Sequence, residues 1–197
     1  MALTSSPYGL RPINAIGGRP FSGSTRQLPI TSGFNTAIAN GDIVQVAANG
    51  TITKVTEVGT NAAAFPAGTV GIFLGCSYTD SVSGFLQNNQ WPAGQVAADA
   101  QAYICDDPNA LFQIQADAAV AQTLMHSNFA INQTAPDTAN GNSRISLDVA
   151  TANTTATIAF KLVDFVNAPD STVGDAFTDV IVKFNPSSHA YTAGLGL

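Results

Sequence analysis

Apolar and polar residues alternate along much of the chain, and this alternation predicts short β-strands. The clearest case is GDIVQVAANGTITKV, residues 41–55, where the alternation lies on both sides of Asn49-Gly50. An Asn-Gly pair between two alternating runs is the strongest short-range signal for a β-hairpin. We expect this hairpin to point four residues inward: Val44, Val46, Ile52 and Val55.

Further strands are expected as far as residue 185. The runs are FPAGTVGIFLGCSYTD, QAYIC, LFQIQA, NFAINQ, SRISLDVA, TIAFKLVDFV and DAFTDVIVKFN. Gly71 and Gly75 interrupt the first run and indicate a bulge or a close approach of backbones. Strands that recur every ten to fifteen residues, with turn residues between them, are typical of a β-barrel or a β-sandwich. The predicted fold class is therefore all-β, with at most one or two short helices.

Two segments depart from the strand pattern. Residues 117–125, DAAVAQTLM, form the best helix candidate, with Asp117 as N-cap. Residues 81–98 are expected to form a loop in which Trp91 anchors the packing. A boundary near residue 98 would divide the body into two β-rich subdomains, 34–98 and 99–197.

The first 33 residues differ from the body. They hold four prolines and the pair Gly17-Gly18, which exclude a regular helix, and yet they carry many apolar side chains. A solvated tail does not normally hold so many apolar residues. We therefore expect residues 1–33 to form an extended N-terminal arm that becomes ordered against a partner or the next subunit. Deleting residues 1–30 should then leave the body folded. The alternative is an N-terminal segment that folds back on its own body.

Charge is scarce and unevenly distributed. Charged residues make up 10% of the chain and the net charge is −6. Residues 1–41 contain three arginines and no acid, a balance of +3, whereas the rest contains 13 acids and four bases, a balance of −9. A surface with few charges favours large protein contacts, because few ions must be desolvated. Seven cations on an acidic chain disfavour nucleic-acid binding, and no apolar run is long enough for a transmembrane helix. The first residues also lack the pattern of a secretory signal.

Candidate chemical groups are few. His126 and His189 lack neighbouring ligands at metal-site spacing, so we expect neither a metal nor a cofactor. Asp106-Asp107 precedes Pro108-Asn109, which favours a β-turn over acid–base catalysis. Cys76 and Cys105 lie in apolar contexts and are expected to be buried thiols, with a single disulfide as the alternative. No nucleophile or phosphate-binding motif is present, and we predict that the protein is not an enzyme.

Several of these runs resemble proteins encoded beside the major capsid protein of tailed bacteriophages. The segment PYGLRPINAIGGRPFSGSTRQLPI resembles the start, and the runs GDIVQVAANGTITKV, FPAGTVGIFLGCSYTD, YICDDPNALFQIQAD and GDAFTDVIVKFNPSSHAY resemble the body, of head decoration or capsid cement proteins. The resemblance implies a viral structural protein without catalytic residues. It would form a homotrimer, bind the outer capsid surface of the virion and stabilise the capsid by bridging major capsid protein subunits, with synthesis in the bacterial cytoplasm.

The matching positions imply which residues would bind the capsid. They are Tyr8, Leu10, Arg11, Pro12, Arg19, Phe21 and Arg26. Two alternatives remain open. One is another virion module, such as a head fibre, tail or adhesion part. The other is a carbohydrate-binding β-sandwich, for which Trp91 and four tyrosines offer few aromatic platforms.

Overall fold

The computed structural model describes residues 4–169 and 171–194, and these are built almost wholly from antiparallel β-strands. Strand accounts for 43% and helix for 3%, which confirms the all-β fold class. Fifteen strands and two single-turn 3-10 helices, η1 (Gln122–Leu124) and η2 (Pro186–Ser188), occur in the described ranges. No helix in these ranges is long and apolar enough to cross a membrane.

The larger sheet has seven strands in the order β13-β12-β14-β15-β11-β1-β2. They are β1 (Arg11–Ala15), β2 (Arg19–Pro20), β11 (Ala110–Gln115), β12 (Asn128–Asn132), β13 (Ser146–Asn153), β14 (Phe160–Phe165) and β15 (Asp179–Phe184). The strands predicted between residues 128 and 185 are confirmed. Two short strands from the start of the chain complete the sheet at one end.

The smaller sheet has six strands, ordered β3-β10-β7-β5-β6 with β8 paired to β7. They are β3 (Arg26–Pro29), β5 (Ile43–Val46), β6 (Ile52–Lys54), β7 (Thr69–Asp80), β8 (Gly84–Asn88) and β10 (Gln101–Cys105). A bridge between Ile30 and Ile52 joins the two ends of this order, so the sheet curls into a partly closed barrel. A separate pair, β4 (Ile38–Ala39) and β9 (Gln90–Trp91), lies beside it.

The Asn49-Gly50 hairpin is confirmed. Val46 on β5 pairs with Ile52 on β6, and Gly50 adopts a φ of +78°. Val44, Ile52 and Val55 are completely buried, whereas Val46 is half-buried at the end of the strand.

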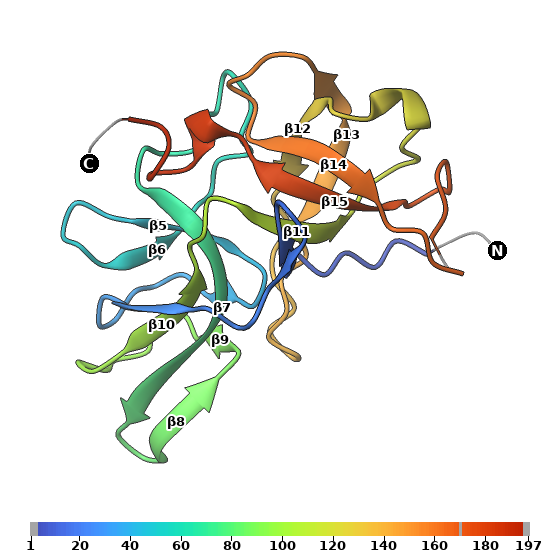
Figure 1. Ribbon diagram of the computed structural model, residues 1–197. Helices are drawn as coiled ribbons and strands as arrows, with labels where there is room; N and C mark the ends of the chain where they lie inside the picture. The colour runs from blue at the N-terminus through green and yellow to red at the C-terminus, as the bar shows by residue number, and fades with distance from the viewer. Residues whose placement is uncertain (1–3, 170, 195–197) are drawn as a thin grey trace.

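Strand β7 separates two hydrophobic cores. Ile72 belongs to the core that the larger sheet covers, and its neighbour Phe73 belongs to the core inside the barrel. Ile43 and Val44 on β5 are divided in the same way. Because successive strand residues point to opposite faces, the smaller sheet is buried on both sides, which explains the nearly unbroken apolar run of β7. Figure 1 shows β7 running between β12–β15 on one side and β5, β6 and β10 on the other.

The predicted irregularity at the glycines of β7 is also present. Gly71 has a φ of +147°, and a Cβ at this position would collide with the carbonyl oxygen of Cys105. The pairing of β7 with β10 shifts register between Tyr103 and Ile104, next to Gly75. Gly71 therefore allows β10 to cross β7 at close range, as the sequence suggested.

Residues 81–98 are more ordered than a loop, because they contain β8 and β9. Trp91 is completely buried in the barrel core, and its Nε1 donates to the carbonyl oxygen of Phe34 at 3.2 Å. Its ring meets that of Tyr78 edge-on at 5.4 Å. The interpretation of Trp91 as a packing anchor is confirmed.

The helix predicted over residues 117–125 is wrong; only the single turn η1 forms there. Asp117 does not cap it. Its carboxylate accepts hydrogen bonds from the Asn132 side chain and the Val149 backbone, which belong to neighbouring strands. A helix of two turns is only marginally stable, and contacts with the sheet outweigh its propensity.

The prediction that the N-terminal segment is an arm separate from the body is also wrong. Residues 4–33 are extended, but β1 pairs with β11 and β3 pairs with β10 of the same chain. Leu10 and Ile30 are buried, one in each core. The apolar side chains of this segment are therefore explained by their own body, which is the alternative of a segment that folds back.

The division between the sheets does not coincide with residue 98. Strand β10 follows that residue but pairs with β7 of the smaller sheet. The change of sheet falls between Cys105 and Ala110, and the N-terminal segment contributes strands to both sheets.

A buried carboxylate connects the parts of the fold. Asp42 Oδ1 accepts from the Ser143 hydroxyl at 2.6 Å, and Oδ2 accepts from Lys54 Nζ at 2.7 Å and from the Ala39 backbone at 2.9 Å. The N-terminal segment passes directly beside this point, since Leu10 donates its backbone N–H to the Gly41 carbonyl oxygen at 3.0 Å. Both carboxylate oxygens are therefore occupied.

We predict that Asp42→Asn destabilises the protein by about 3–5 kcal/mol, because an amide leaves the buried Lys54 ammonium without a counter-charge. Urea unfolding would measure the loss. Adding Lys54→Met should recover part of it, since the stranded cation is then removed. If Asp42→Asn alone were as stable as the original chain, the charge of this carboxylate would contribute nothing to the free energy of unfolding.

We also predict that Leu10→Ala costs about 2–5 kcal/mol through the cavity it leaves. Ile16→Ala, at a side chain that is 47% exposed, is the matched control and should change stability by no more than about 0.5 kcal/mol.

Deletion of residues 1–30 should prevent folding, as judged by the loss of a cooperative thermal transition. A truncated chain that unfolds cooperatively near the original temperature would contradict the assignment of this segment to the core.

Candidate functional site

The seven residues expected to bind a capsid do not form one surface. Leu10 is completely buried and stabilises the core, so the assignment of this residue to a contact surface is wrong. Pro12 lies within β1, opposite Phe112 of β11. The other five reach the surface in three places, around Tyr8 and Arg11, around Arg19 and Phe21, and at Arg26.

Residues 16–27 are the most exposed part of the N-terminal segment, and we call them the N-terminal face. All of them are exposed except Phe21, which is half-buried against the core of the larger sheet. The backbone is held in place, because Ile16 donates its N–H to the Asn109 carbonyl oxygen at 3.0 Å. Arg19 and Phe21 line a shallow cavity of about 210 Å³ next to Asp107.

The N-terminal face also supplies an edge to each sheet. Strand β2 is the last strand of the larger sheet and β3 is the first strand of the smaller one. Edge strands present backbone groups to which another chain can add. Pro20 and Pro29 lie in these strands and lack a donor, which limits how far such pairing extends.

Arg26 is tied to the body by an ion pair with Asp106 at 2.7 Å, although its side chain is 56% exposed. The Tyr191 hydroxyl donates to the same carboxylate at 2.8 Å, and the Arg26 guanidinium lies 5.5 Å from the centre of the Tyr191 ring. Partial burial, and next the hydrogen bond to Asp106, raise the pKa of Tyr191 to about 12. This cluster fixes β3 against the end of the chain.

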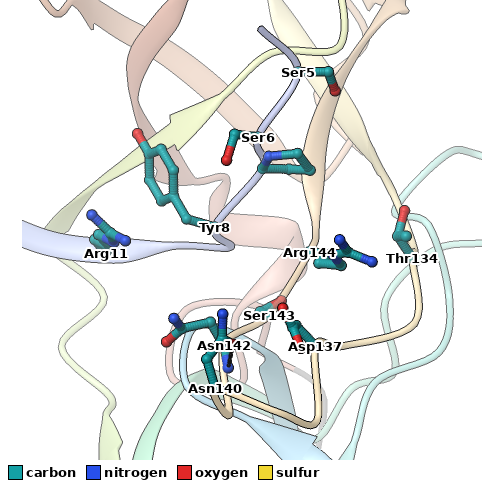
Figure 2. Close-up of a pocket in the computed structure, with 11 residues that line it drawn as sticks. Ser5, Ser6, Tyr8, Arg11, Thr134, Asp137, Asn140, Asn142, Ser143 and Arg144 are labelled. Carbon is teal, nitrogen blue, oxygen red and sulfur yellow. Dashed lines mark hydrogen bonds between the residues drawn. The ribbon is translucent and has the colours of Figure 1, made fainter.

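A larger polar cavity of about 460 Å³ lies on another side of the N-terminal segment (Figure 2). Tyr8 and Arg11 form one wall, with the Arg11 guanidinium 4.1 Å from the centre of the Tyr8 ring. Arg144, from the loop between β12 and β13, lines the opposite wall. Burial and the nearby Asp179 raise the pKa of Tyr8 above its usual range.

The aspartates and cysteines considered for chemistry lie in a turn and in the two cores. Asp107 accepts from the Asn109 backbone at 2.8 Å, which confirms the predicted turn. Cys76 and Cys105 are free and buried in different cores, and burial raises their pKa values to about 12 and about 11. Within the described ranges, no three His, Cys, Asp or Glu residues gather where they could hold a metal ion.

Sequence reasoning missed several surface features. Asp106 was assigned only to a turn, Tyr191 was considered only as one of the four tyrosines, and Arg144 received no role. A second exposed feature is the tip of the β7–β8 hairpin, where Val82 is 91% exposed and Phe85 is also exposed. The only signal for the hairpin was the alternation in GFLQN, which is too short to distinguish from a loop.

Comparisons with known proteins give no further guidance, because no family model, no curated protein and no solved structure matches the chain.

His189, for which the sequence showed only the absence of neighbouring metal ligands, is buried against the rings of Phe184 and Tyr191. Burial lowers its pKa from the ordinary value of about 6.5. The His189 imidazole therefore becomes protonated at a lower pH in the folded state than in the unfolded state. The stabilisation that comes from the neutral, buried imidazole is complete above pH 6.5 and is lost as the pH falls towards the folded pKa.

We predict that the free energy of unfolding falls more steeply between pH 7.5 and 5.5 in the original chain than in His189→Gln. Urea unfolding at several pH values would measure both slopes. The control His126→Asn retains the buried His189 and should retain the steeper slope. Equal slopes for the original chain and His189→Gln would show that the buried His189 does not cause the pH dependence of stability.

Proposed function

We propose that this protein is a structural part of a tailed-phage particle that binds the outer surface of the capsid and bridges major capsid protein subunits. The resemblance of its sequence runs to head decoration and capsid cement proteins suggests this role. The structural observation that supports it is the N-terminal face, a basic and exposed segment on an otherwise acidic body.

The charge distribution favours this face as the contact surface. Arg19 and Arg26 lie on it and, together with Arg11, carry all the charge of residues 1–41. The remaining residues of the face are mostly Ser, Gly, Thr and Pro, which cost less to desolvate than charged side chains do. A contact with few ions to dehydrate suits a protein that covers another protein surface.

The edge positions of β2 and β3 provide a second physical route to binding. A partner strand or loop can add hydrogen bonds along β2, or along β3 as far as the Ile30–Ile52 bridge that partly closes the barrel, as in β-augmentation. A homotrimer, which the resemblance implies, would present three such faces at once. Many modest contacts around a closed shell then give firm attachment through avidity.

Because Leu10 and Ile30 belong to the cores, the face cannot be tested by removing the whole segment. Point variants at exposed positions separate binding from folding. Ile16→Asp and Arg19→Glu place negative charge on the face, and neither side chain forms a hydrogen bond or ion pair with the described residues.

We expect each variant to reduce attachment to shells assembled from the major capsid protein of the same phage by at least about tenfold, a loss typical of a residue at the centre of an interface. Co-sedimentation with purified shells would measure it. Val82→Asp makes the same aliphatic-to-acid change on the β7–β8 hairpin and should leave attachment intact. Full attachment by both face variants, with unchanged unfolding midpoints, would refute the proposed contact surface.

A further inference from the structure

The cavity of about 460 Å³ next to the N-terminal segment contains two arginines without acidic partners. Arg26 pairs with Asp106 and Lys54 pairs with Asp42, whereas the other five cations form no ion pair with any described residue. Arg11 and Arg144 differ from the other three because both line this one cavity. Two unpaired guanidinium groups facing one cavity form a site for an anionic group.

Arg144 is held on a rigid loop. Ser143 donates its backbone N–H to the Asn40 carbonyl oxygen at 2.8 Å, and its hydroxyl donates to the buried Asp42. Asn89 Nδ2 donates to the Asn140 carbonyl oxygen at 2.7 Å and binds the loop to the β8–β9 connection. The backbone that carries Arg144 is therefore positioned before any ligand arrives, which lowers the entropic cost of binding.

The opposite wall is equally well anchored. Gly9 packs so closely against Ser143 that a Cβ there would lie 2.5 Å from the Ser143 Cβ, and the neighbouring Leu10 is a core residue. The Arg11 guanidinium lies 4.1 Å from the centre of the Tyr8 ring, and this cation–π contact holds it next to the cavity. Figure 2 shows Tyr8 and Arg11 on one side of the cavity and Arg144 on the other.

The remaining lining decides which anion fits. Neutral hydroxyl and amide groups contribute further donors, from Ser5, Ser6, Thr134, Asn140 and Asn142. One acid, Asp137, also lines the cavity, and its Oδ1 accepts from the Ala139 backbone at 3.0 Å. Two arginines and one aspartate leave a balance of +1, which a single carboxylate neutralises. A phosphate dianion would leave excess negative charge next to Asp137.

We propose that this cavity binds a carboxylate group, with Arg144 and Arg11 donating to its oxygens. The carboxylate is supplied either by an acidic side chain of a protein partner or by a free organic acid, and the two sources share the same chemistry at the site. This site is distinct from the N-terminal face, and its occupancy does not depend on the proposed role in the capsid.

Calorimetric titration of the full chain at low ionic strength tests the proposal with two probes. The first is glucuronate, with glucose as its uncharged counterpart. The second is the peptide acetyl-Gly-Glu-Gly-amide, with acetyl-Gly-Gln-Gly-amide as its counterpart. We expect saturable binding of at least one acid and none of its neutral counterpart.

Arg144→Gln should weaken this binding at least about tenfold, because a charge-assisted pair of hydrogen bonds is lost. Arg144→Lys should weaken it less, since it keeps the charge but loses the planar pair of donors. Arg19→Gln removes an equivalent charge outside the cavity and should have no effect.

Each outcome decides the question. Binding of glucuronate assigns the site to free acids, and binding of the peptide alone assigns it to a protein partner. The proposal is overturned when neither acid binds, or when Arg144→Gln weakens binding no more than Arg19→Gln does, which would indicate binding elsewhere or only a general electrostatic attraction.

Discussion

One buried carboxylate joins three separate segments of the fold. Asp42 binds Lys54, Ser143 and the Ala39 backbone with its two oxygens, and so joins the barrel to the loop between β12 and β13. Among the described residues it is the one acidic side chain with no exposure to solvent. A buried charge is tolerated only when it is fully paired, so the partners of Asp42 must come together for the chain to fold. The N-terminal segment is positioned by the same junction, through Leu10 and Gly41.

The N-terminal segment contributes both to the stability of the cores and to the exposed N-terminal face. The N-terminal segment crosses from the larger sheet to the smaller one, and its buried residues Leu10 and Ile30 complete both cores. The exposed residues between them are therefore displayed on a fixed backbone and not on a flexible tail. A preordered basic surface loses less entropy on binding than an arm that must first become ordered. The same rigidity holds Arg11 and Arg144 on opposite walls of the polar cavity.

Local patterns predicted the strands well, because alternation and turn residues act over a few positions. The Asn49-Gly50 hairpin, the bulged glycines of β7 and the turn at Asp106–Asn109 follow from such short-range rules. The helix at 117–125 failed because side-chain contacts to Asn132 and Val149 outweigh a weak propensity. Pairing between distant segments has no local signature, so neither β1 on β11 nor Arg26 next to Asp106 and Tyr191 could be predicted. Arg144 was missed for the same reason, since its meaning depends on Arg11, which is 133 positions earlier in the chain.

We propose that the N-terminal face attaches this protein to the outside of a capsid. A cryo-electron microscopy map of shells mixed with the full chain would show this attachment. We expect density for the protein on the outer surface of the shell, with residues 16–27 against the major capsid protein. Density in which residues 16–27 face solvent, or shells without any bound protein, would contradict it.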